Sequence, residues 1–219
     1  MSKTRSKSRR AENLQDASSS NLSQSIKRTL AEGQLHLIQA ANPRDFSALV
    51  VERASTPRAP VWMANAQSKG SASRKSVQES YERCLELYRT LVRPQDTTYD
   101  DAGAALAFFV AMNLRALHEL PTTPETLLLL ERQLNAVARQ ASRWDTAAVS
   151  ERQFYCEQMA MLGVFVAGLA SRAQTEGAVA RAKVRNAARG YLRQVLGIDP
   201  DLLTFGAHGL AVRPASAAA

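Results

Sequence analysis

The chain has 219 residues and a formal net charge of +8, enough for one sizeable core and a disordered extension. Residues 1–75 contain thirteen Lys and Arg against five Asp and Glu, whereas residues 76–219 contain fifteen of each. All of the excess positive charge lies in the first third. Residues 76–219 have no net charge, so this distribution excludes nucleic-acid binding by overall charge for that part of the chain.

Residues 1–20 predict a disordered basic tail. The first ten, MSKTRSKSRR, contain no acid and no hydrophobic residue after Met1, so they cannot bury enough apolar surface to become ordered. Such a tail could contact nucleic-acid phosphates, attract an anionic membrane, serve as an export signal or only increase solubility. Its candidate polyanion-binding residues are Lys3, Arg5, Lys7, Arg9 and Arg10, with Lys27 and Arg28 following.

Residues 21–75 predict a weakly structured arm and linker. Leu22, Ile26, Leu30 and Leu37 have the spacing of a short amphipathic helix over residues 21–39. Beyond it, three X-Pro pairs indicate turns and extended chain, and SKGSASRKS at residues 68–76 is typical of a linker. We expect the apolar residues between 46 and 63 to dock on the core as an extended arm.

Residues 76–212 predict an all-α, single-domain bundle of about five helices, and residues 213–219 should fray. Ser76 and Glu79 have the spacing of a capping box at the start of the first helix, which should end before Pro94. Asp100 and Asp101 precede an Ala-rich second helix, where acids satisfy the first backbone N–H groups.

A third helix should start near Pro124, where Thr122 and Glu125 have capping-box spacing, and continue to about Ala141. Trp144 follows in a connection. We expect its ring to plug the edge of the core.

The segment Ser150–Arg172 is the longest strongly apolar stretch and predicts the central core helix. Ser150 and Gln153 again suggest a capping box. The uninterrupted apolar run is twelve residues, shorter than the about 20 needed to cross a bilayer. One stripe of this helix consists of small residues, namely Cys156, Ala160, Gly163, Ala167 and Ala170. We expect this stripe to let the second helix come close through its own small stripe, which consists of Gly103, Ala107 and Ala111.

A fifth helix over Ala178–Leu196 should end at Gly197, a residue type that favours the position after a helix. Its arginines recur every four residues and form a ridge along one side; they are Arg181, Arg185, Arg189 and Arg193. A partner rich in carboxylates or phosphates could bind this arginine ridge. Alternatively, the arginines only solvate an exposed face and pair with acids of the first helix.

The sequence contains no recognisable catalytic or metal-binding motif. The three histidines at 36, 118 and 208 lie in separate regions without metal-ligand spacing. There is no G-x-S-x-G motif, glycine-rich phosphate loop or dinucleotide fingerprint. Cys84 and Cys156 are far apart and should be buried free thiols. We therefore expect no catalysis, no cofactor and no metal ion.

Several segments resemble a bacterial family of uncharacterised helical proteins, a domain of unknown function. The resemblance covers about Ser55 to Leu210 and is carried by STPRAPVWMANAQ, YERCLELYRTL, DDAGAALAFFVAMNL, SERQFYCEQMAMLGVFV and GYLRQVLGIDPDLLTFGAHGL. Members usually carry an export signal, which implies a periplasmic or secreted location. This chain has a Ser-rich basic arm there instead, and its default location is the cytoplasm.

These patterns favour a non-enzymatic interaction protein, an adaptor, inhibitor or accessory factor that binds a protein partner through helix surfaces. One alternative is nucleic-acid or other polyanion binding through the basic tail. Another is a secreted bacterial effector whose N-terminus is a disordered export signal.

Overall fold

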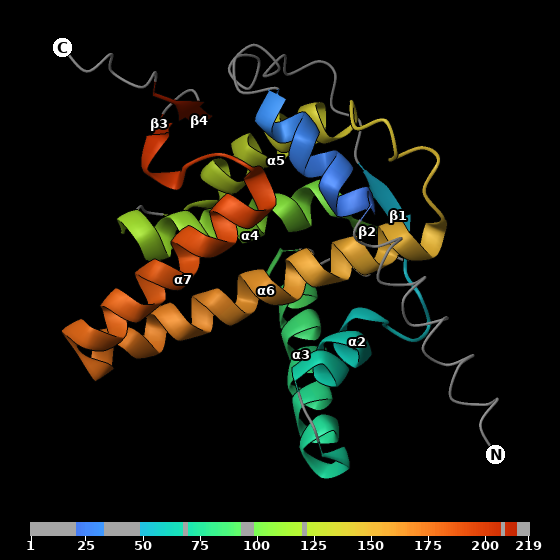
Figure 1. Ribbon diagram of the computed structural model, residues 1–219, viewed down its shortest axis with the longest axis horizontal. Helices are drawn as coiled ribbons and strands as arrows, with labels where there is room; N and C mark the ends of the chain where they lie inside the picture. Colours follow the sequence, from blue (N-terminus) through green and yellow to red (C-terminus); the bar gives the residue numbers. More distant parts are fainter. Residues whose placement is uncertain are drawn as a thin grey trace, which may run out of the picture.

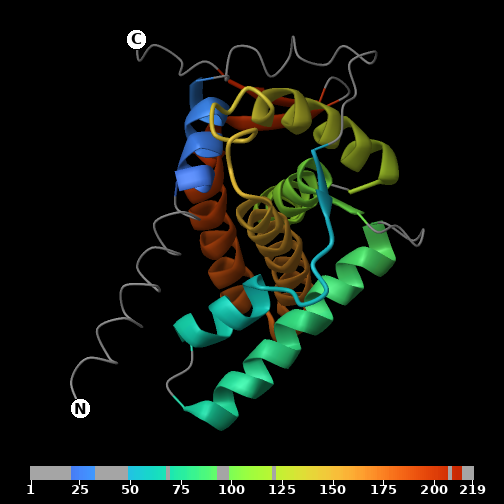
Figure 2. The same ribbon diagram turned by 90° about the vertical axis from the view of Figure 1, so that its right-hand side faces the viewer.

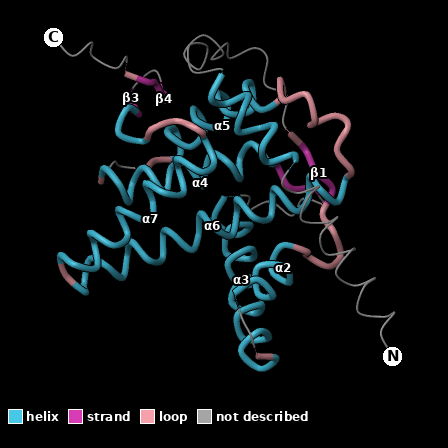
Figure 3. The backbone as a smooth tube through the Cα atoms, in the orientation of Figure 1, coloured by secondary structure: helices cyan, strands magenta, loops and turns pink. Residues whose placement is uncertain are grey.

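The computed structural model describes residues 21–32, 49–67, 70–92, 99–119, 122–206 and 209–213. Helices dominate this part of the chain, and its strands form two short antiparallel pairs (Figure 1, Figure 3). The predicted all-α class is confirmed. In chain order the elements are a helix over residues 21–32, β1 (Val50–Glu52), α2 (Ala59–Gln67), α3 (Ser71–Val92), β2 (Tyr99–Asp101), α4 (Ala102–His118), α5 (Pro124–Ala138), α6 (Val149–Glu176), α7 (Ala178–Leu196), a 3₁₀ turn (Pro200–Leu202), β3 (Leu203–Gly206) and β4 (Gly209–Val212).

Two helices organise the core. Fourteen of the 17 residues of α4 are buried, which makes it the most completely enclosed helix, with α5, α6 and α7 packed around it. The predicted central helix, α6, is longer and contacts α2, α3, α4, α7 and β1. In Figure 2, α4 and α6 lie side by side in the middle of the molecule, and α3 crosses them at a steep angle.

The start of α4 is capped as the sequence predicts. Asp101 Oδ1 accepts hydrogen bonds from the backbone N–H groups of Gly103 and Ala104, at 2.8 and 2.9 Å. A carboxylate there also favours the positive end of the helix dipole. Asp101 lies at the end of β2, so the same residue ends the strand and begins the helix.

The small stripe on α6 receives α4, and at Gly163 the residues that meet it are phenylalanines. A Cβ at Gly163 would lie 2.5 Å from Cδ1 of Phe108 and 3.3 Å from Cα of Phe109, both on α4. Gly103, the glycine in the small stripe of α4, instead faces the Asn135 side chain of α5. At Gly163 the α4–α6 contact is therefore a large residue placed over a glycine, and Gly103 is not part of it.

Two of the predicted helix starts are wrong. Helix α3 begins at Ser71, which places Ser76 inside the helix and makes residues 71–76 helical where a linker was expected. Helix α6 begins at Val149 without a side-chain cap, and Gln153 Nε2 donates to the Glu52 carbonyl of β1 at 2.6 Å. At α6 the side chain expected to cap the helix is instead used in a long-range contact, because Gln153 bonds to β1.

Two described segments before α3, residues 21–32 and 49–67, contribute buried residues to the core. Leu22, Ile26 and Leu30 of the helix over residues 21–32 are fully buried, as their spacing predicts. The expected extended arm is wrong at α2, which is a helix. Its second residue, Pro60, suits a first helical turn, where its missing N–H is not needed.

The last two described strands form an antiparallel pair. β3 and β4 pair in the register Leu203↔Val212, and the buried Gln133 of α5 extends the hydrogen bonding. Its amide accepts from Leu210 N at 2.8 Å and donates to Leu210 O at 3.4 Å. Leu203 of β3 is buried in the core, and the expected burial of Trp144 is confirmed.

Helix α6 is long and apolar enough to cross a membrane by length and composition alone. Half of the relevant window is buried in the fold, and core helices meet the same criteria. Among the described residues it is the one helix of this kind, so it is weak evidence for a membrane.

The close approach at Gly163 gives a direct test of the α4–α6 packing. Gly163→Ala should lower the free energy of unfolding by about 1–3 kcal/mol, because the new methyl group overlaps the Phe108 ring. The matched control is Gly168→Ala on the same helix, where a Cβ meets nothing within 4 Å. That variant should gain up to about 1 kcal/mol from helix propensity. Urea unfolding measures both, and equal effects at the two positions would contradict the packing.

Candidate functional site

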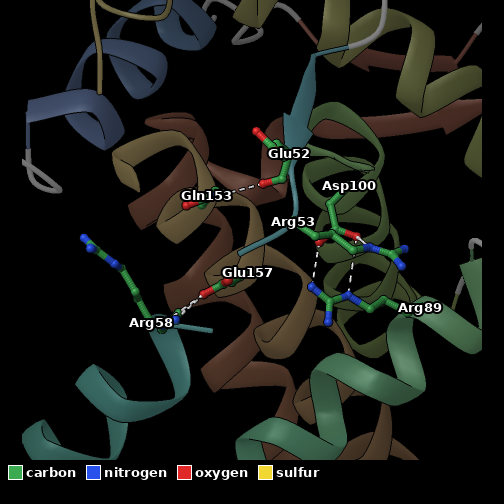
Figure 4. A network of polar contacts seen from close by, with 8 residues as sticks. Glu52, Arg53, Arg58, Arg89, Asp100, Gln153 and Glu157 are labelled. Atoms are coloured by element: carbon green, nitrogen blue, oxygen red, sulfur yellow. Dashed lines mark hydrogen bonds and ion pairs between the residues drawn. The ribbon is translucent and has the colours of Figure 1, made fainter. Parts of the chain in front are cut away.

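A buried charged network joins β1, β2 and α3 (Figure 4). Asp100 accepts from Arg53 Nε at 2.8 Å and from Arg89 Nη2 at 2.7 Å, and its side chain is 7% exposed. The sequence predicted a capping role for both Asp100 and Asp101, but only Asp101 caps α4. Asp100 faces away from the helix end because neighbouring strand residues point to opposite sides.

Helix α6 contributes two further buried carboxylates, and each meets the N-terminal part of another helix. Glu157 Oε2 accepts from the backbone N–H groups of Arg58 and Ala59, at 2.8 and 2.9 Å, at the start of α2. Glu151 Oε1 accepts from Leu22 N, in the first turn of the helix over residues 21–32, at 3.2 Å. These N–H groups have no partner within their own helices, so the α6 carboxylates act as caps supplied from a distance.

Burial raises the pKa of Glu157, and the nearby carboxylate of Asp100 raises it further. The bonds from Ala59 and Arg58 and the charge of Arg89 oppose that shift. The strongly buried Cys156 also has a raised pKa, because burial and the surrounding acids disfavour its thiolate. A protonated thiol is a poor nucleophile, and these carboxylates are already bound by the chain itself. The network is therefore suited to holding segments together.

The predicted arginine ridge is present along α7, but its partners are not the acids of the first helix. Arg185 pairs with Glu119 at the end of α4. Arg189 pairs with Asp201 at 3.1 Å. Arg193 pairs with Asp199 at 3.3 Å. The alternative that the arginines pair with acids of α3 is therefore wrong for these three, because α7 packs on α4 and α6 and their partners are acids that follow α4 and α7.

One end of the ridge opens into a groove of about 560 Å³ between α4, α6 and α7, here called the arginine groove. Arg115, Arg181, Arg185 and Glu119 supply its charged groups. The remaining lining residues are Met112, Ala116, Ala167, Ala170, Ser171, Ala173, Gln174 and Val184. The sequence pattern identified Arg181 and Arg185 but missed Arg115 and Glu119, since no local spacing links α4 to α7.

Glu119 has an unusual backbone. It is the one residue other than glycine with a positive φ in the described segments, at φ 58° and ψ 28°, where it ends α4. Side chains with a Cβ rarely adopt this left-handed conformation. The conformation closes α4 through a bond from Glu119 N to Arg115 O and coincides with the pairing of Glu119 with Arg185.

The structure describes only some of the other candidate site residues. The tail residues Lys3, Arg5, Lys7, Arg9 and Arg10 lie outside the described residues, as do two of the three histidines. Among the described residues no group of three or more His, Cys, Asp or Glu could hold a metal ion.

The fold and the site together define this protein as a helical bundle with an arginine groove on its surface. A model of a family of unknown function, DUF6683, matches residues 6–213, and the chain belongs to that family. No curated protein and no solved structure matches the chain.

The buried carboxylate of Glu157 predicts a specific pH dependence. Because folding raises its pKa above the ordinary value of 4.5, protonation favours the folded state. This stabilisation is present at low pH and is lost as the pH rises above 4.5. The unfolding free energy of the wild type, minus that of Glu157→Gln, should therefore fall with rising pH. Urea unfolding from about pH 4 to 7 measures it, and a difference that stays constant or rises would contradict the assignment.

Proposed function

We propose that this protein is a non-enzymatic interaction protein that binds an acidic surface of a protein partner through the arginine ridge of α7. The observation that carries the proposal is the placement of the ridge on a helix that buries only Ala188, Leu192 and Leu196. These three residues hold α7 on the bundle, and the arginine ridge runs beside them along the same helix, so its arginines project from a rigid support.

The existing ion pairs of the ridge do not prevent such binding. The side chains of Arg185, Arg189 and Arg193 are 40–61% exposed in these pairs. Exposed ion pairs contribute about 0–1 kcal/mol, so a partner's carboxylates can replace Glu119, Asp199 and Asp201 at little cost. Exchange of one carboxylate for another would give specificity and a salt-dependent association rate more than high affinity.

The buried acids support a structural role over chemistry. Asp100, Glu151 and Glu157 accept hydrogen bonds from the chain's own arginines and backbone N–H groups. Each therefore has a partner that accounts for its burial without a substrate. A binding partner would therefore contact the exposed surface of the protein and not these buried acids.

The test is a pull-down with the full chain as bait in nuclease-treated lysate of the source cells. Replacing Arg181, Arg185, Arg189 and Arg193 by Gln should lower recovery of a specific protein at least about tenfold, since each lost charged contact weakens the complex. The matched control replaces four exposed arginines elsewhere, namely Arg74, Arg83, Arg143 and Arg172.

The control variant should recover the protein as the wild type does. Equal losses in both variants would show a general charge effect and contradict the proposal. A protein that is recovered from untreated lysate but not from nuclease-treated lysate would favour the alternative, polyanion binding through the basic tail.

A further inference from the structure

We infer that the arginine groove is the acid-binding pocket of this surface, that it takes carboxylate side chains of an acidic segment of the partner, and that Glu119 occupies it in the partner's absence. The inference rests on the proposed function and specifies the chemistry of the partner. It concerns one end of the ridge, where α4 and α6 form further walls of the groove.

The charge of the groove is unbalanced. Three arginines, Arg115, Arg181 and Arg185, line it against one acid, Glu119. Within the described part of the chain, Glu119 is bound to Arg185, whereas the side chains of Arg115 and Arg181 have no hydrogen-bond or ion-pair partner. Two guanidinium groups are thus free to bind further acceptors, and guanidinium groups bind carboxylates through paired hydrogen bonds.

Glu119 shows which chemistry the groove accepts. Its carboxylate reaches Arg185 from a left-handed backbone position that side chains rarely adopt. Strained positions of this kind are concentrated at functional sites. The pair is also exposed, with 48% and 62% of the two side chains accessible, so an incoming carboxylate can displace it.

The rest of the lining favours an amino-acid side chain. Met112, Ala167 and Val184 supply apolar surface beside the charges. The aliphatic stem of a glutamate can lie on this surface while its carboxylate reaches an arginine. A volume of about 560 Å³ is large enough for a few side chains of a peptide.

The test uses a fluorescein-labelled hexaglutamate peptide and the full chain, with anisotropy measured at low salt. Arg115→Gln and Arg181→Gln should each weaken binding about fivefold to tenfold, because each removes a bidentate partner. The matched control is Arg172→Gln, which removes the same charge from an exposed pair with Glu176 outside the groove lining. It should change the affinity less than about twofold.

A second pair of variants tests the role of Glu119. Glu119→Gln frees Arg185 and should tighten peptide binding about threefold to tenfold. Glu176→Gln, the matched control, raises the net charge by the same amount and frees Arg172. It should leave the affinity for the peptide within about twofold. Because the controls alter net charge equally, binding of the peptide to the basic tail would affect both members of each pair alike.

Equal effects in the matched pairs would overturn the inference. A labelled single-stranded oligodeoxynucleotide of equal charge is the comparison probe. If the groove variants weaken the oligonucleotide and leave the peptide unaffected, the groove recognises phosphate and the inference is wrong. If peptide binding is unaffected while the ridge variant loses its partner in the pull-down, the proposed function survives and binding uses the Arg189–Arg193 end.

Discussion

The structure depends on buried carboxylates that cap helices from a distance. Glu157 and Glu151 project from α6 and bind backbone N–H groups at the start of α2 and of the helix over residues 21–32. A carboxylate buried at this depth is costly unless it is fully hydrogen-bonded. The N-terminal segments supply those bonds, so each segment and its carboxylate require one another. This mutual requirement fixes where the segments lie on α6.

The arrangement has a consequence for the surface. The N-terminal segments bind Glu151 and Glu157 in the first part of α6, and Asp100 ties β2 to α3 through Arg89. The later part of α6 packs with α7 and the end of α4, where the arginine groove opens. The buried acids therefore stabilise the fold near the start of α6. The exposed arginines of α4 and α7, which lie beside the end of α6, are available for binding.

Much of the fold follows from local pattern, and the long-range contacts do not. The spacing of Leu22, Ile26 and Leu30 and the acid before α4 gave correct predictions because each depends on a few neighbouring residues. The sequence does not predict helix α2, because an X-Pro pair at Pro60 is typical of turns and extended chain, although proline also suits a first helical turn. The ridge was visible as a four-residue repeat. Its pairing with Glu119 was not, since 66 residues separate Arg185 from that acid.

The most direct test of this account is amide hydrogen exchange of the full chain with Glu157 replaced by Ala. Loss of the carboxylate leaves the N–H groups of Arg58 and Ala59 without an acceptor, so exchange in α2 should accelerate while α5 and α7 stay protected. Glu176→Ala, at the exposed end of α6, is the control and should change neither. Unchanged exchange in α2, or equal acceleration in every helix, would contradict the claim that Glu157 holds α2 on the core.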